Sequence, residues 1–205
     1  AFVGNSPFPM KLVNNSIFLR FMSDFETLLE KAKAFHGDAC PGILMGTRMT
    51  MAGMRELGMN PMEKNRDLIV YVEIDRCATD AIQAITGVTL GHRTLKFRDY
   101  GKFAATFVDS RSGKAVRVTA IPKKGEKEQD FRAIAQNLAV VPESELFTIQ
   151  KVTVTIPDED LPGQPTHKEF CSTCGEQILD NREMNTNGII QCKNCAFGSY
   201  YIAIE

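Results

Sequence analysis

Apolar and polar residues alternate along the chain with two periods, one typical of helices and one typical of strands. Helical patterns cover residues 23–35, 41–57, 79–86 and 126–139, and strand patterns cover residues 68–74, 94–108, 115–121 and 146–156. Residues 109–114 carry a hairpin signal between two of the strands. The order lacks the regular strand–helix–strand repeat of a doubly wound sheet. The pattern therefore predicts a mixed α+β core of helices packed on a sheet.

Capping signals mark the ends of the first two helices. Ser23 suits the N-cap of the first helix, with Glu26 completing a capping box, and Gly37 suits its C-cap. Pro41 is well placed at the first position of the second helix, which we expect to end at Gly58. A junction of a few residues therefore separates the two helices.

The chain divides into three segments of different composition. We expect a core domain over residues 1–156, with residues 1–21 as an N-terminal extension. Residues 157–168 hold three prolines and three acids, which predicts an extended linker. Residues 169–205 are too few to bury an adequate apolar core, so a bound metal would supply the folding energy of this segment.

Four cysteines in the C-terminal segment form two pairs, each with two intervening residues. They are Cys171, Cys174, Cys192 and Cys195. Two such pairs can complete a tetrahedral zinc site, and their spacing is typical of a zinc ribbon. Two disulfides would use the same residues, but the rest of the chain argues against an oxidising compartment. We therefore predict one structural zinc per chain.

Composition and charge narrow the class of protein. The chain of 205 residues is 43% hydrophobic and 24% charged, with a formal net charge of −1, as in an ordinary globular protein without a bias toward nucleic acid or anionic membrane. No apolar run approaches the ~20 residues of a transmembrane helix, and the first residues do not resemble a secretory signal. The isolated cysteines Cys40 and Cys77 indicate a reducing compartment. These features predict a cytoplasmic protein without a membrane segment.

The charge of the C-terminal segment argues against a nucleic-acid-binding finger. From residue 165 onward, three basic residues stand against five acids, whereas phosphate binding needs clustered positive charge. The aromatic residues of this segment fit a small core or a contact with a protein partner better than they fit bases. A contact with a protein partner is therefore one expectation for this segment, beside a small core of its own, and nucleic acid is not expected.

Four residues near two helix starts could carry chemistry. His36 and Cys40 lie at the junction of the first two helices, where Cys40 takes an N-cap position that favours a thiolate. Cys77 and Asp80 lie between a strand and the next helix. If the two pairs meet, they form a pocket for a transition metal or a nucleophile with its base. The alternative is two small buried thiols and two residues that stabilise helix ends.

Other candidates are weaker. His92 lies in a loop bounded by glycines and suits a solvent-facing or packing role, and His167 lies outside both cysteine pairs. Six of the nine methionines fall between Met45 and Met62. A thioether copper site is one interpretation of this cluster, but a packed helix–helix seam, within or between subunits, fits methionine better.

Two motifs carry a resemblance to a known family. The run His36-Gly-Asp-Ala-Cys40-Pro-Gly-x3-Gly46-x-Arg48 is followed by Cys77-x2-Asp80-Ala81-Ile-Gln83-x2-Thr86-Gly87-x3-Gly91. Together with the four-cysteine segment, they resemble the FmdE family, whose name is that of a subunit of formylmethanofuran dehydrogenase. The resemblance implies an α+β core, which in this family stands alone or carries a zinc ribbon, and an intertwined dimer.

The resemblance also bears on function. The family is named for its association with a molybdenum or tungsten enzyme that reduces carbon dioxide on methanofuran, but this chain has no pterin or iron–sulfur motif of its own. The resemblance implies that His36, Cys40, Cys77 and Asp80 form a functional or metal site. Asp38 stands where the family pattern often has a second histidine.

Three hypotheses follow, in order of preference. The first is a non-catalytic homodimer that binds zinc in its C-terminal segment and a second transition metal or a small ligand in its core, and that acts as an accessory or regulatory partner of a redox system. The second is an enzyme that uses Cys40 as thiolate or metal ligand and His36 as base or ligand. The third is a nucleic-acid-binding regulator with a zinc ribbon.

Overall fold

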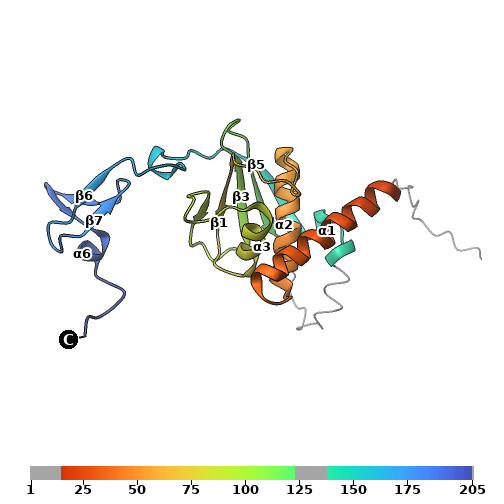
Figure 1. Ribbon diagram of the computed structural model, residues 1–205, viewed down its shortest axis with the longest axis horizontal. Helices are drawn as coiled ribbons and strands as arrows, with labels where there is room; N and C mark the ends of the chain where they lie inside the picture. Colours follow the sequence, from red (N-terminus) through yellow and green to blue (C-terminus); the bar gives the residue numbers. More distant parts are fainter. Residues whose placement is uncertain (1–14, 123–137, 205) are drawn as a thin grey trace, which may run out of the picture.

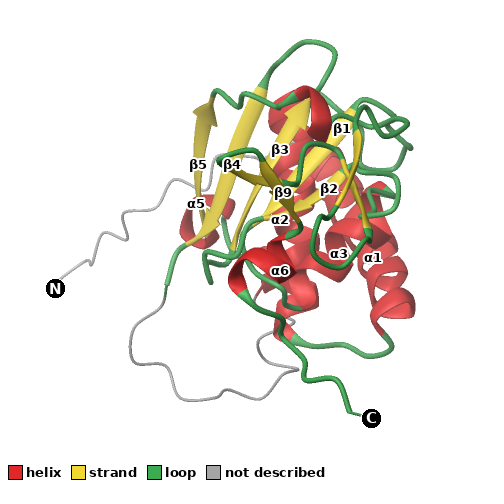
Figure 2. Ribbon diagram, turned by 90° about the vertical axis from the view of Figure 1, so that its left-hand side faces the viewer, coloured by secondary structure: helices red, strands yellow, loops and turns green. Residues whose placement is uncertain are grey.

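A computed structural model of the chain describes residues 15–122 and 138–204. A layer of helices packs on a five-stranded sheet, and a smaller part with four cysteines follows toward the C-terminus (Figure 1, Figure 2). The predicted mixed α+β class is therefore confirmed. Residues 1–14 of the expected extension, and nearly all of the helix expected over residues 126–139, lie outside the described residues.

The first helix is longer than its capping signal predicts. Helix α1 spans Asn15–His36, so the start predicted at Ser23 is wrong. The Ser23 carbonyl accepts a hydrogen bond from Thr27 Oγ1 at 2.9 Å, within the helix. The added turns are held by packing, because Phe21 contacts the apolar core and lies under the guanidinium of Arg48. Tertiary contacts thus override the local capping signal.

The junction between the first two helices follows the sequence closely. Gly37 has a φ of 101° and donates its N–H to the Lys33 carbonyl, which ends α1 as predicted. Helix α2 spans Pro41–Leu57, with Cys40 as N-cap and Gly58 (φ 75°) as C-cap. Helix α3 spans Cys77–Thr86 and begins two residues before the predicted start.

Five strands form the sheet in the order β2-β1-β3-β4-β5. They are β1 Leu68–Val72, β2 Leu95–Phe97, β3 Ala104–Asp109, β4 Ala115–Ala120 and β5 Phe147–Val152. Strand β1 pairs in parallel with β2 and antiparallel with β3, and the other pairings are antiparallel. The hairpin predicted at residues 109–114 joins β3 and β4.

The single strand expected over residues 94–108 is in fact two strands. Strands β2 and β3 lie on opposite sides of β1, so the chain must pass around the end of β1 between them. Residues 98–103 make this passage, with Gly101 at a φ of 63° and the Lys102 N–H donating to the Glu73 carbonyl at 3.1 Å. Periodicity alone does not report this change of partner.

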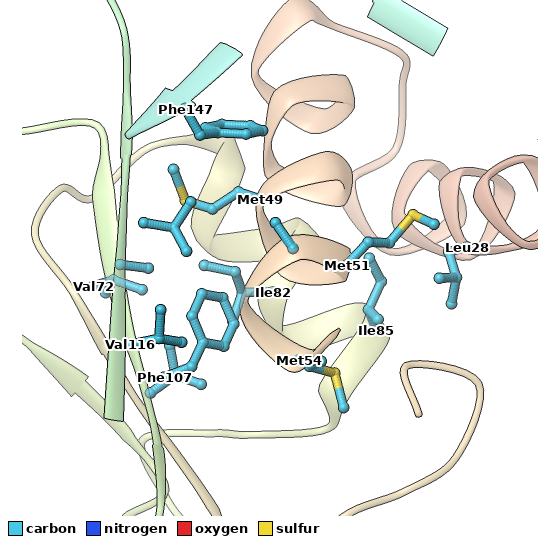
Figure 3. Close-up of a cluster of buried hydrophobic side chains, with 14 of the residues drawn as sticks. Leu28, Met49, Met51, Met54, Val72, Ile82, Ile85, Phe107, Val116 and Phe147 are labelled. Atoms are coloured by element: carbon cyan, nitrogen blue, oxygen red, sulfur yellow. The ribbon is translucent and has the colours of Figure 1, made fainter. Parts of the chain in front are cut away.

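The main apolar core lies between the helices and one face of the sheet. Figure 3 shows Met49 between α2 and the sheet near Phe147, Phe107 beside the lower turns of α2 on the side of the sheet, and Met51 directed toward Leu28 of α1. Met49, Met51 and Met54 are all buried here, so the methionine-rich helix fills the core of its own chain. A second cluster around Ile69 and Tyr71 covers the other face of the sheet.

A short helix, α5 Glu143–Leu146, precedes β5. The linker expected after β5 is not wholly extended, because it contains a 3-10 turn, η1 Asp158–Asp160, in which Asp160 is buried. The C-terminal part contains two hairpins and a short helix: β6 Lys168–Phe170, β7 Gln177–Leu179, β8 Met184–Thr186, β9 Ile189–Gln191 and α6 Lys193–Phe197. No helix within residues 15–122 and 138–204 has the length and apolar character needed to cross a membrane.

Candidate metal centres

Three helix ends converge at the core candidate. His36 is the last residue of α1, Cys40 caps α2, and Cys77 opens α3. The ligand atoms of these three residues all lie within 4.8 Å of one another. Residues far apart in sequence are thus brought to one partly buried point.

Asp80 orients the histidine of this cluster. Its Oδ2 lies 2.7 Å from His36 Nδ1, whereas His36 Nε2 lies 3.7 Å from Cys40 Sγ. When the carboxylate of Asp80 is ionised it can only accept, so Nδ1 is then the donor and Nε2, on the side of Cys40, is left to act as a ligand atom. Asp38 stands at the edge, with Oδ1 3.4 Å from Nε2 and a side chain that is 76% exposed.

Glycines of α2 permit this convergence. A Cβ at Gly42 would lie 2.8 Å from Cys77 Cβ, and a Cβ at Gly46 would lie 2.7 Å from Ala78 Cα of α3. Real Cβ atoms essentially never approach so closely. The two helices therefore meet at a distance that only glycine allows, and this contact sets the separation of Cys40 from Cys77.

The electrostatics of the core cluster suit a cation. The Ile43 N–H donates to Cys40 Sγ at 3.4 Å, and both cysteines lie at helix N-termini, which favour negative charge. Burial, and then the neighbouring Cys40, raise the pKa of the Cys77 thiol. A bound metal ion would supply the positive charge that such a thiol needs to ionise.

The other histidines lie apart from these cysteines. His92 is exposed, in the loop before β2, and lines a cavity of about 690 Å³. His167 lies 3.3 Å from a carboxylate oxygen of Glu183 and 3.7 Å from one of Glu169.

The four C-terminal cysteines form a second cluster. Their sulfurs lie within 4.8 Å of one another, and Cys174 Sγ is 3.9 Å from Cys192 Sγ. Tetrahedral zinc–sulfur bonds of about 2.3 Å imply sulfur–sulfur separations of roughly 3.8 Å, so this donor set fits zinc. The first pair lies in a turn between β6 and β7 that Gly175 closes at a φ of 76°, and the second pair begins α6, with Cys192 as its N-cap.

Backbone amides and neighbouring sulfurs shift the pKa values of these thiols in opposite directions. Hydrogen bonds from the backbone of Cys174 and Cys192 lower the pKa of Cys171 to about 6. Hydrogen bonding to Cys192, followed by burial, raises the pKa of Cys195 to about 12. Crowded thiols therefore resist full ionisation by themselves, and a divalent cation offsets their mutual repulsion.

Sequence reasoning missed a third cluster of charged side chains. Arg93 and Lys96, on either side of the start of β2, meet Asp160 of η1 and Asp180 and Arg182 of the C-terminal part. The members are scattered over the sequence and carry no motif spacing. The one signal was the run of basic residues around β2, which alone did not indicate an acidic partner.

Fold and donor sets define the class of this protein: an α+β core joined to a four-cysteine zinc-finger domain. The family described as "FmdE, Molybdenum formylmethanofuran dehydrogenase operon" matches residues 35–160, and the family described as "Prokaryotic dksA/traR C4-type zinc finger" matches residues 165–201. The chain belongs to the FmdE family, as its two motifs predicted.

Two known proteins extend the comparison. A protein of Archaeoglobus fulgidus named "Probable S-adenosyl-L-methionine-binding protein" is 30% identical over 212 residues, which cover 89% of this chain and 56% of that protein. The chain thus spans little more than half of this curated relative. A crystal structure from Syntrophus aciditrophicus, described as that of a "tungsten formylmethanofuran dehydrogenase subunit e (fmde)-like protein", has a TM-score of 0.60 at 23% identity, over 87% of this chain and 95% of that one. This second likeness concerns the fold.

Proposed function

We propose that the core binds one transition-metal ion through His36, Cys40 and Cys77, in addition to the structural zinc that Cys171, Cys174, Cys192 and Cys195 would hold. The protein would then act as a non-catalytic accessory or regulatory homodimer of a redox system of the formylmethanofuran dehydrogenase type. The convergence of two thiols and one imidazole at three helix ends carries this proposal.

The donor set favours a metal over a purely structural cluster. Two thiols and one imidazole suit zinc and other soft or borderline divalent ions. The hydrogen bond from His36 to Asp80 is the outer-shell contact commonly found behind a histidine ligand. Three protein ligands would leave a coordination position for a small ligand or for a group on a partner.

Metal content per chain tests the proposal. We expect about two metal ions in the wild type and about one in Cys40→Ser and in Cys77→Ser, measured by elemental mass spectrometry after gentle purification. Glu30→Gln, on the exposed face of α1, is the matched control and should keep both ions. One ion in the wild type and in all variants would refute the core metal site and leave the finger intact.

An enzyme is the second candidate, because Asp80, His36 and Cys40 stand in the order of orienting acid, base and nucleophile. Successive contacts of 2.7 and 3.7 Å link the three residues. This arrangement predicts that iodoacetamide alkylates Cys40 of the metal-free protein faster than it alkylates a free thiol, and that Asp80→Asn slows the reaction. Alkylation at the rate of a free thiol in both proteins would exclude this candidate.

S-adenosyl-L-methionine is a third candidate, through the Archaeoglobus fulgidus relative. The cavity of about 690 Å³ has the volume of small-molecule sites, and Lys64 and Arg66 at its wall could pair with the ligand's carboxylate. Calorimetry should then detect binding to the wild type and weaker binding to Lys64→Ala, whereas Lys151→Ala, on the edge strand β5 at the opposite side of the sheet from β2, should bind like the wild type. Absence of binding to the wild type would exclude this ligand.

The proposed homodimer and partner surface rest on exposed apolar side chains. In the C-terminal part, Phe170 is 62% exposed and Phe197 is 73% exposed. We expect this surface to be available to a protein partner and the chain to elute as a dimer. Light scattering on the eluting peak tests the dimer, and the mass of a single chain would contradict it. Co-purification that Phe197→Ser abolishes would support the partner surface.

A further inference from the structure

The charged cluster between the sheet and the zinc finger has more cations than acids. Asp160 receives Arg98 Nη2 at 3.1 Å and Arg182 Nη2 at 3.2 Å, and Lys96 Nζ donates to its backbone carbonyl. Asp180 receives Arg93 Nη1 at 2.6 Å and Arg182 Nη1 at 3.2 Å. Four cations thus share two carboxylates, which leaves two positive charges in excess.

Nearby groups among the described residues do not neutralise this excess. Burial lowers the pKa of Lys96; Asp160 opposes that shift, and Arg93, Arg182 and Arg98 add to it. The adjacent carboxylate of Glu183 faces His167. Burying Lys96 next to three guanidinium groups and one acid is costly unless a further anion joins them.

Two local features of the cluster are energetically unfavourable: a left-handed backbone at two residues and a buried donor atom without a partner in the described part of the chain. Arg93 and Asp180, which bond to each other, both have left-handed backbones, with φ of 60° and 59°. Residues other than glycine seldom adopt this conformation, and it concentrates at functional positions. In addition, Arg93 Nη2 is buried without a hydrogen-bond partner among the described residues.

The charged side chains surround a cavity that can hold a small ligand. Its volume is about 270 Å³, and Arg93, Lys96, Arg98 and Arg182 all line it, together with Asp160. Arginine forks match the oxygen geometry of phosphate, and lysine adds a point charge. The excess charge therefore faces a space large enough for a tetrahedral oxyanion.

We propose that this charged cluster between the sheet and the zinc finger binds a phosphate group, either as inorganic phosphate or on a small ester. Its ligands would come from the β2 region of the core and from Arg182 of the finger. A bound phosphate would then hold the zinc finger against the core. This inference is independent of the core metal site, because the cluster shares no residue with it.

Titration of the full-length, zinc-loaded protein with inorganic phosphate tests the proposal. We expect saturable binding by calorimetry and a rise in Tm, whereas sodium chloride at the same ionic strength should give neither. Arg98→Gln and Arg182→Gln each remove one charge-assisted donor and should weaken binding about tenfold or more. Both side chains are about half exposed, so the variants should fold.

A matched control and a second ligand complete the experiment. Arg111→Gln removes an arginine that is 81% exposed at the β3–β4 hairpin, and should bind phosphate like the wild type. Glycerol phosphate, titrated in parallel, distinguishes the sources: tighter binding than inorganic phosphate would indicate an ester, and weaker binding the free ion. The proposal is overturned if neither ligand gives saturable binding, or if Arg111→Gln loses as much affinity as Arg98→Gln.

Discussion

Gly46→Ala tests whether the close approach of α2 and α3 positions the core site. The added Cβ would lie 2.7 Å from Ala78 Cα and 2.8 Å from Ala81 Cβ, whereas ordinary contact begins at 3.4 Å. Helix α3 would have to retreat by roughly 0.7 Å, because the clash is with its backbone. The same movement would draw Cys77 away from Cys40.

The expected loss of stability is the difference of two terms. Overpacking a core costs about 1–3 kcal/mol, and the upper end applies where backbone must move. Replacing glycine by alanine within a helix returns about 1 kcal/mol. We therefore expect the free energy of unfolding to fall by about 2 kcal/mol, which corresponds to a decrease in Tm of roughly 4–8 °C for a domain of this size.

Urea unfolding followed by far-ultraviolet circular dichroism is the suitable assay, because the chain has no tryptophan. Gly53→Ala is the comparison, since its Cβ would lie 2.2 Å from Phe107 Cδ2, on the side of α2 that faces the sheet. Both variants should lose stability, but Gly46→Ala alone should also lose core metal. Wild-type stability and metal content in Gly46→Ala would refute the role of this helix contact.

Arg48→Lys should lower the free energy of unfolding by about 2 kcal/mol. The buried guanidinium donates to the carbonyls of Leu138, Ala139 and Val141, and an ammonium group cannot reach all three. Urea unfolding measures the change, and an unchanged midpoint would contradict it. The Ser112 hydroxyl and nearby amides lower the pKa of Asp109, so its contribution to stability should be complete above roughly pH 5 and lost as the pH falls through that lowered pKa. Thermal unfolding of the wild type and of Asp109→Asn, measured from neutral pH down through the lowered pKa, tests this pH dependence. The difference in Tm between the two proteins should shrink on acidification, and a growing difference would contradict the prediction. Removal of zinc by a chelator should unfold residues 168–204 while the sheet keeps its hydrogen-exchange protection, and equal loss of protection in both parts would contradict separate stabilisation.

Local signals predicted the features that local chemistry determines. The bounds of α2 follow from Pro41 and Gly58, whose backbone requirements act within one turn of the helix. The spacing of the C-terminal cysteines likewise indicated a zinc-binding domain. For the core site, the sequence could place His36 beside Cys40, but Cys77 reaches them through the contact of α2 with α3. Gly42 and Gly46 were the local signs of that contact, because a Cβ at either position would clash with α3.

Features that depend on distant partners escaped sequence reasoning. The start of α1 depends on the packing of Phe21 against the core. The break between β2 and β3 arises because these two strands pair with opposite edges of β1. In the sequence, Asp160 is one of three acids in an expected linker, yet it is buried because it pairs with Arg98 and Arg182. From composition alone such an acid is expected to be exposed to solvent, because composition does not show which cations surround the carboxylate.

One local device recurs at both cysteine clusters, with different consequences. Cys40 and Cys192 are each an N-cap, and each sulfur accepts the N–H of the residue three positions on, at 3.4 Å. In the finger, few apolar side chains are buried, among them Cys171 and Ile178, so zinc supplies most of what holds the cluster together. In the core, Ile43, Ala32 and Ala81 pack beside Cys40 and Cys77 and hold the donors in place. We therefore expect that a metal or ligand at the proposed core site could exchange without unfolding of the core, whereas loss of zinc would unfold the finger.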